Sequence, residues 1–113
     1  KFYISNNLKI GNYCLFGPNV TIWDSNNHSL NPSSRVEDAI QISKGKLNAF
    51  SIGGGDIEIE DNVWIGMDTL ILGGVKIGKN SVISARSVIT KDVPPNTLVG
   101  GIPARIIKKI DNE

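Results

Sequence analysis

The stretch Ile59–Thr90, IEDNVWIGMDTLILGGVKIGKNSVISARSVIT, repeats a pattern every six residues. Its regularly spaced isoleucines are Ile59, Ile65, Ile71, Ile77, Ile83 and Ile89. Nearer the start of the chain the same interval separates Ile4, Ile10, Phe16 and Ile22. A helix repeats about every 3.6 residues and a strand every two, so neither explains the spacing. A six-residue repeat is typical of a parallel β-helix, in which each hexad supplies one short strand and one turn.

A second series follows the first at an interval of four residues, and its members are mostly small or β-branched. It consists of Leu8, Cys14, Val20, Val63, Thr69, Val75, Ser81, Ser87 and Val93. We expect three hexads to close one triangular coil, with both series pointing into its core, Cys14 included. Glycine often follows the isoleucine directly, and asparagine is frequent in the turns, where both residues suit a positive φ.

The six-residue period disappears between about residues 27 and 56, which predicts a long loop excursion from the coil. A loop of that length inside a compact domain is uncommon and usually functional. Part of it has the pattern of a helix, because Ser34 followed by Glu37 has the spacing of a capping box. The only histidine of the chain, His28, lies at the root of this excursion.

The end of the repeat is marked by a proline pair, Pro94–Pro95. Because proline has no N–H to donate to a β-ladder, the pair is expected to end the coil. A short apolar tail, Ile102 to Ile110, should then fold back on the last turn of the coil.

Composition limits the functions that need considering. A length of 113 residues suits a single domain, 1–113. The chain carries 12 basic and 11 acidic residues, so it offers no basic field for nucleic acid. No apolar run approaches the roughly 20 residues of a membrane span. A single cysteine fits a reducing compartment, so we expect a cytoplasmic protein. Because the chain begins at Lys1 inside the repeat, we also expect natural residues upstream of it.

Two motifs resemble the hexapeptide-repeat acyltransferases, which fold as left-handed parallel β-helices. The C-terminal segment VITKDVPPNTLVGGIPAR (88–105) is similar to a specific signature of that family. The segment GPNVTIWDSNNH (17–28) resembles the part that delivers the catalytic histidine in maltose, galactoside and polysaccharide O-acetyltransferases. The resemblance implies an all-β, left-handed β-helix. It also implies a homotrimer whose active sites lie between neighbouring subunits.

The resemblance also implies positions that bind coenzyme A. Ala85 matches a position whose main chain bonds the pantetheine arm, and Thr90 and Lys91 match a pair near the nucleotide. Arg105 and Lys108 match two basic positions that meet phosphates, although relatives often carry arginine at the second. A surface charge would look the same at Lys91 and at Arg105.

Two more positions are expected to contact the cofactor, and of these Trp64 is expected near the thioester. Met67 stands where relatives often have serine, so only a main-chain contact carries over. Trp64 should point outward and matches an aromatic residue of the sugar acetyltransferases, with a subunit contact as the alternative.

The resemblance makes His28 a general base, a role that suits histidine because it exchanges a proton near neutral pH. Asp24 and Asp56 are two candidates for the carboxylate that orients it. Asp24 and Asn27 are also expected to contact the substrate. The asparagine that serves the oxyanion in the sugar acetyltransferases would fall before Lys1.

Together these features predict an acetyl-CoA-dependent O-acetyltransferase that transfers acetyl directly to a sugar hydroxyl and needs no metal. The acceptor is expected to be a surface polysaccharide or its precursor. An N-acetyltransferase of an amino sugar and a non-catalytic trimeric scaffold remain as alternatives. A zinc-dependent carbonic anhydrase on the same coil would need several histidines, and this chain has one.

Overall fold

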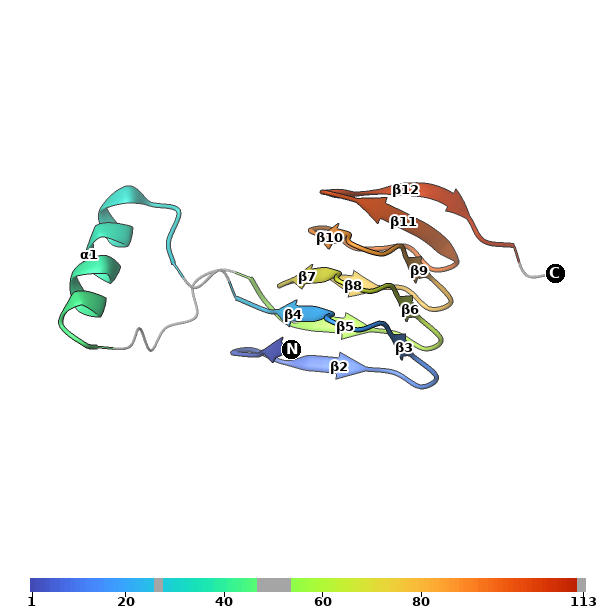
Figure 1. Ribbon diagram of the computed structural model, residues 1–113, viewed down its shortest axis with the longest axis horizontal. Helices are drawn as coiled ribbons and strands as arrows, with labels where there is room; N and C mark the ends of the chain where they lie inside the picture. Colours follow the sequence, from blue (N-terminus) through green and yellow to red (C-terminus); the bar gives the residue numbers. More distant parts are fainter. Residues whose placement is uncertain (26–27, 47–53, 112–113) are drawn as a thin grey trace.

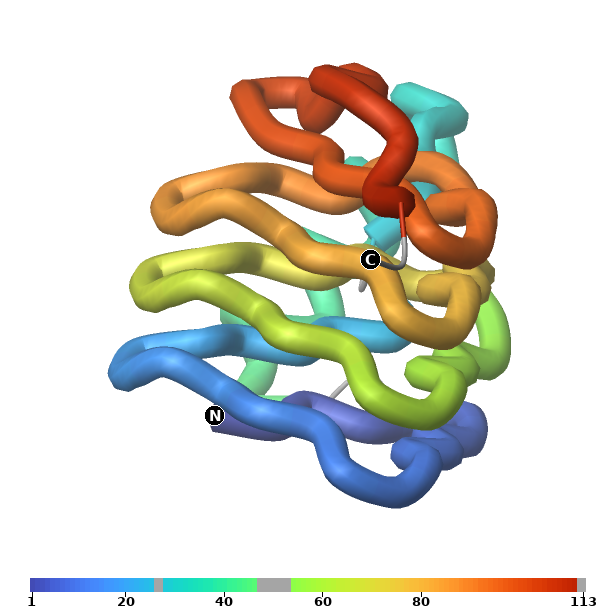
Figure 2. The backbone as a smooth tube through the Cα atoms, turned by 90° about the vertical axis from the view of Figure 1, so that its right-hand side faces the viewer, coloured from blue at the N-terminus to red at the C-terminus, as the bar shows by residue number. Residues whose placement is uncertain are grey.

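The computed structural model describes residues 1–25, 28–46 and 54–111, and in them the chain climbs as a stack of short parallel strands (Figures 1 and 2). The strands are β1 (Phe2–Tyr3), β2 (Leu8–Ile10), β3 (Leu15–Phe16), β4 (Thr21–Trp23), β5 (Ile57–Ile59), β6 (Trp64–Ile65), β7 (Leu70–Leu72), β8 (Lys76–Ile77), β9 (Val82–Ile83), β10 (Val88–Ile89), β11 (Thr97–Gly101) and β12 (Ala104–Lys109). They form three sheets, with orders β1-β4-β7-β10, β2-β5-β8 and β12-β11-β9-β6-β3. We call these sheets A, B and C. Each makes one side of a triangular prism.

The handedness of the coil can be followed in Figure 1, where the chain climbs from the N-terminus at the bottom to β12 at the top. The nearer strands β4, β7 and β10 run to the left, and the fainter, more distant β2, β5 and β8 run to the right. A coil whose front strands move left as it rises is left-handed. The predicted all-β, left-handed parallel β-helix is therefore confirmed.

The core is a column of stacked isoleucines. Register pairs Ile22 with Ile71, and Ile71 with Ile89, so equivalent hexad positions of successive turns lie in contact. The column is fully or almost fully buried from Ile22 onward. The small residues of the second series fill the corners. Ser81, for example, is buried, and its Oγ donates to the Pro94 carbonyl at 2.6 Å.

The first turn of the coil departs from the expected core. Ile4, Ile10 and Phe16 were expected inside the prism, yet all three are exposed, Ile10 by 37%. Ile10 and Phe16 keep the expected register, but this turn has a neighbour on one side only, so its inward face meets no second layer. Ile4 is out of register, because Phe2 pairs with Ile22 in its place. Cys14 is half-buried and packs against the core, and its Sγ donates to the Glu60 carbonyl at 3.1 Å.

The glycines that follow the isoleucines serve a different purpose from the one expected. Gly66 and Gly78 do not have positive φ. A Cβ at Gly66 would lie 2.6 Å from the Ala85 nitrogen, and one at Gly78 would lie 2.4 Å from the Pro95 nitrogen. Glycine is needed there because the backbone of the next turn passes too close for any side chain.

Among the described non-glycine residues, positive φ instead occurs at the third residue after the isoleucine position, with Asn96 as the one exception. The residues with this conformation are Tyr13, Asn19, Asn62, Asp68, Asn80, Arg86 and Asn96. Four of them are asparagine, the side chain that tolerates left-handed backbone best after glycine. The asparagines also form a ladder, in which Asn62 Nδ2 donates to Asn80 Oδ1 and Asn80 Nδ2 donates to Asn96 Oδ1.

The excursion from the coil contains one helix, α1 (Pro32–Ser43), as the sequence pattern indicated. The capping residue is Asn31 rather than Ser34: the Asn31 side chain accepts from the Ser34 N–H at 3.2 Å. Pro32 can occupy the first helical position because no hydrogen bond is required of that nitrogen. No residue of α1 is buried, and Figure 1 shows the helix projecting beyond the tips of β4 and β7.

The proline pair turns the coil but does not end it. After Pro94–Pro95 the chain forms β11, which pairs in parallel with β9 as part of sheet C. The prediction that the pair ends the coil was wrong. The prolines occupy a corner of the coil, where no β-ladder hydrogen bond is required from their nitrogens. The tail then folds back as expected, with β12 antiparallel to β11.

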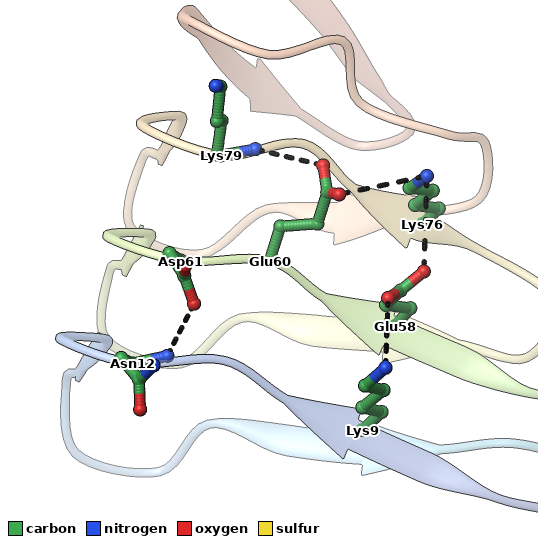
Figure 3. A network of polar contacts seen from close by, with 7 residues as sticks. All are labelled: Lys9, Asn12, Glu58, Glu60, Asp61, Lys76 and Lys79. Atoms are coloured by element: carbon green, nitrogen blue, oxygen red, sulfur yellow. Dashed lines mark hydrogen bonds and ion pairs between the residues drawn. The ribbon is translucent and has the colours of Figure 1, made fainter.

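Charges of opposite sign interleave on the outer face of sheet B (Figure 3). Glu58 lies between Lys9 and Lys76, with N–O distances of 3.9 Å to each. Lys76 also reaches Glu60 at 3.7 Å. Glu58 and Glu60 are thus partnered by lysines of the neighbouring turns. The one helix of the described residues is too short and too polar to cross a membrane.

Candidate active site

A groove of about 550 Å³ runs over the outer face of sheet C. Its lining residues are Gly17, Pro18, Trp64, Gly66, Met67, Val82, Ile83, Ser84, Ala85 and Leu98. Three residues singled out from the sequence meet in it: Trp64 on β6, Met67 in the turn after β6, and Ala85 in the turn one coil above. Trp64 points outward and is exposed, as its position before an inward isoleucine predicts. The groove can take an extended, largely apolar ligand.

A second hollow, of about 370 Å³, lies where β10 ends. It is lined by Ile89, Thr90, Lys91, Asp92, Val93, Val99, Ala104, Arg105 and Ile106. The fold therefore brings Thr90 and Lys91 together with Arg105, although fourteen residues separate the last two along the chain. The Asp92 carboxylate accepts the Lys76 N–H at 2.8 Å, which ties this turn to the coil below. Two cations at one hollow suit a phosphate group.

Lys108 is placed by an irregularity in the last hairpin. The register between β11 and β12 shifts at Leu98/Val99, so that Lys108 pairs with Leu98 and Arg105 with Gly100. Leu98 and Gly100 are two residues apart and share one face of β11. Without the bulge, Arg105 and Lys108, three residues apart, would point to opposite faces. The bulge puts both cations on the face of sheet C that carries the groove.

His28 belongs to the excursion and not to the coil. Its Nδ1 lies 3.3 Å from Oδ2 of Asp38 on α1. In Figure 1 the helix lies on the other side of the coil from β6 and β9. Within one chain, the structure therefore does not bring the excursion to the groove that contains Trp64 and Ala85.

The two aspartates named as orienting candidates have other partners. Asp24 is fully buried, and its two carboxylate oxygens accept the backbone N–H groups of Ser5 and Asn6, each at 2.7 Å. Asp56 accepts the Asn7 N–H at 3.2 Å. Both carboxylates fasten the first turn of the coil. Asn27, the other expected substrate contact, lies outside the described residues.

Comparison with known proteins identifies the family of the chain. Residues 56–91 match the family described as bacterial transferase hexapeptide (six repeats). The chain is 41% identical to the galactoside O-acetyltransferase of Lactococcus lactis over 91% of this chain and 44% of that protein. A galactoside acetyltransferase solved in complex with coenzyme A superposes with a TM-score of 0.79, at 36% identity over 97% of this chain and 48% of the other. The chain belongs to the hexapeptide-repeat acyltransferase family.

A second solved member of the family is a hexapeptide-repeat-containing acetyltransferase from Vibrio cholerae, complexed with acetyl coenzyme A. It superposes with a TM-score of 0.76, at 32% identity over 98% of this chain and 66% of that one. The present chain spans less than half the length of both galactoside acetyltransferases that it matches.

Two features of this hexapeptide-repeat site were not anticipated from the sequence. Asp38 was not considered as a partner of His28, although Asn31, Arg35 and Asp38 have the spacing of one helix face. The bulge in β12 was also missed, because a register shift leaves no periodic signal in so short a segment. Among the described residues, no three histidine, cysteine or acidic side chains gather closely enough to hold a metal ion.

Proposed function

We propose that this chain is the cofactor-binding and base-carrying part of an acetyl-CoA-dependent O-acetyltransferase that acts on a sugar hydroxyl. The observation that carries the proposal is the grouping of side chains far apart in the sequence. Trp64, Met67 and Ala85 line one groove, and Lys91 and Arg105 line a hollow at the end of β10. A coil that served only as a scaffold would need neither.

Acetyl-CoA, when bound, supplies the activated acetyl group. In the proposed arrangement the groove holds the pantetheine arm, with the main chain at Ala85 bonding one of its amides. Trp64 and Met67 cover the end that carries the thioester. Thr90, Lys91, Arg105 and Lys108 serve the nucleotide end, where cations offset the phosphate charge. The apolar groove and the cationic hollow fit the two ends of this cofactor.

His28 is the proposed general base. A sugar hydroxyl is a poor nucleophile until its proton is being removed, and an imidazole is suited to accept that proton. The same imidazole then returns the proton to the departing thiolate. No covalent acyl-enzyme is required, and Cys14, whose Sγ donates to a main-chain carbonyl beside the core, has no part in the scheme.

We place each active site between two subunits of a trimer. The support is that α1 has no buried residue and projects away from its own coil, while the groove on sheet C is open. A neighbouring coil that received the excursion would place His28 of one subunit beside the groove of the next. The exposed Trp64 would lie at that boundary.

The acceptor is proposed from the relatives. The Lactococcus protein carries the name galactoside O-acetyltransferase, which favours a sugar hydroxyl over an amine. A surface polysaccharide or its precursor, modified in the cytoplasm where the single cysteine would stay reduced, completes the proposal.

The test is thiol release from acetyl-CoA across a panel of sugars and amino sugars, measured with the natural protein that carries this chain. We expect release to depend on a sugar that offers only hydroxyl groups. Release only with amino sugars would replace O-transfer by N-transfer. If acetyl-CoA failed to bind at all in calorimetry, the chain would be a scaffold and the proposal would be wrong.

A further inference from the structure

The segment that carries His28 is fastened to α1 by several contacts. Ser29 Oγ accepts the Asn31 N–H at 3.0 Å, and Asn31 Oδ1 accepts the Ser34 N–H at 3.2 Å. Arg35 Nη1 donates to the carbonyls of Leu30 at 3.1 Å and Ser29 at 3.4 Å. The residues next to His28 are therefore held against the first two turns of the helix.

The contacts come from one face of α1. Asn31, Arg35 and Asp38 follow one another at intervals of four and three residues, which places them in one row along a helix. Asn31 caps the helix, Arg35 clamps the two carbonyls, and Asp38 reaches His28 itself, with Oδ2 lying 3.3 Å from Nδ1. The Asp38 side chain is 16% exposed and that of His28 is 43% exposed, so the carboxylate is the more sheltered partner.

The chemistry of this contact decides which ring nitrogen is basic. An ionised carboxylate can only accept a hydrogen bond, so Nδ1 must carry the proton that it donates. In the neutral ring, Nε2 then has the free lone pair that a general base needs. A carboxylate behind the imidazole also stabilises the charge that develops when the ring takes up the proton of the acceptor.

Neighbouring carboxylates do not replace Asp38. Asp24 and Asp56 accept backbone N–H groups of the first turn of the coil. Glu37, the residue before Asp38, accepts from Gln41 Nε2 at 2.8 Å along the helix. From these contacts we infer that Asp38 is the positioning residue of His28, holding the imidazole with Nδ1 protonated and Nε2 free. The inference rests on the proposed function only for its catalytic consequence.

The test observes the ring nitrogens of His28 by NMR in the natural protein, where the signals that disappear in His28→Ala identify them. We expect the neutral ring of the natural protein to be in the Nδ1–H tautomer, seen from the nitrogen chemical shifts. Asp38→Ala should move the population toward the Nε2–H tautomer. Glu37→Ala is the matched control, since it deletes a carboxylate one position away and should leave the tautomer unchanged. Alanine favours helix at both positions, so α1 should be kept.

The kinetic readout separates the inference from the proposed function. Asp38→Ala should lower kcat about 10- to 100-fold, part of the 10²–10⁴ that a general base contributes, while KM for acetyl-CoA stays the same. An unchanged tautomer in Asp38→Ala, or an equal change in Glu37→Ala, would overturn the inference. A tautomer set by Asp38 in a protein without acetyl transfer would uphold it and overturn the proposed function.

Discussion

At the scale of single residues, the hexad requires a left-handed backbone conformation at one position, and the pattern of hydrophobic residues does not reveal it. A non-glycine residue with positive φ stands third after the isoleucine position in six of the turns, and asparagine fills three of these places. Tyr13 is the bulkiest residue with this conformation. Its side chain is 86% exposed, so packing does little to offset the cost of a left-handed backbone.

Tyr13→Asn should therefore stabilise the protein. The left-handed region costs an ordinary residue about 1–2 kcal/mol, and asparagine less, so we expect a gain of about 0.5–1 kcal/mol in the free energy of unfolding. Urea denaturation measures it. Tyr13→Ala removes the same ring but keeps the unfavourable backbone, and should show no such gain. Equal stability of both variants would mean that the ring, not φ, sets the energy.

The isoleucines themselves could be predicted from the sequence, because a repeat of six leaves one inward direction per hexad. The exposure of Ile10 and Phe16 at the first turn could not be predicted, since the periodic rule does not say whether a second layer covers them. Ile4 could not be predicted because the register pairs Phe2 with Ile22. The role of Gly66 was also missed. Its reason is the close passage of the Ala85 backbone, whose nitrogen would lie 2.6 Å from a Cβ at position 66, and no local pattern records this approach between turns.

At the scale of elements, α1 and the β11–β12 hairpin carry proposed site residues that lie outside the six-residue repeat. These are Asp38 on α1, and Arg105 and Lys108 on β12. The capping-box spacing correctly indicated a helix but named Ser34 as its cap. Asn31 is the cap because Pro32 follows it at the first helical position. Since no residue of α1 is buried, local interactions bear most of its stability.

Asn31→Ala should weaken α1 specifically. The loss of an N-cap costs about 1 kcal/mol, and a 12-residue helix with no buried residue is only marginally stable. We expect faster amide exchange in residues 32–43 with an unchanged coil. Ser34→Ala is the control, because the Ser34 side chain has no part in the cap and its N–H is kept. Faster exchange in Ser34→Ala alone would restore the original capping assignment.

The bulge in β12 predicts which tail cations matter to the cofactor. Arg105 and Lys108 share the face of sheet C that carries the groove, whereas Lys109 pairs with Thr97. Arg105→Ala should weaken acetyl-CoA binding about tenfold or more, the size of one hydrogen bond to a charged group, and Lys108→Ala somewhat less. Lys109→Ala should have little effect. Calorimetry at two salt concentrations would check this, and equal losses for all three would indicate a general charge effect.

At the scale of the whole molecule, the coil was predictable, and the trimer that the resemblance implies stays a prediction. The spacing of Ile59 to Ile89 requires a triangular coil, and the resemblance correctly indicated its left hand. Charges separated in sequence meet on sheet B, as Lys9, Glu58 and Lys76 do, only because the coil places residues of successive turns side by side. The distance between α1 and the groove is a property of the fold that the sequence did not indicate.

That separation predicts complementation between two impaired variants, assayed at an acetyl-CoA concentration well below the KM. His28→Ala and Arg105→Ala each disable a different part of the proposed site. If the two parts come from neighbouring subunits, trimers reassembled from a mixture contain some interfaces with both parts intact, and activity should return. Two batches of His28→Ala mixed in the same way serve as the control. No recovery in verified mixed trimers would mean that each chain supplies its whole site.

The central claim is that His28 acts as the base in acetyl transfer from acetyl-CoA. Its most direct test is kcat of the natural protein beside that of its His28→Ala variant, with acetyl-CoA affinity measured on both. We predict that kcat falls about 10²- to 10⁴-fold while the affinity stays the same. A variant that transfers acetyl at the natural rate would contradict the claim.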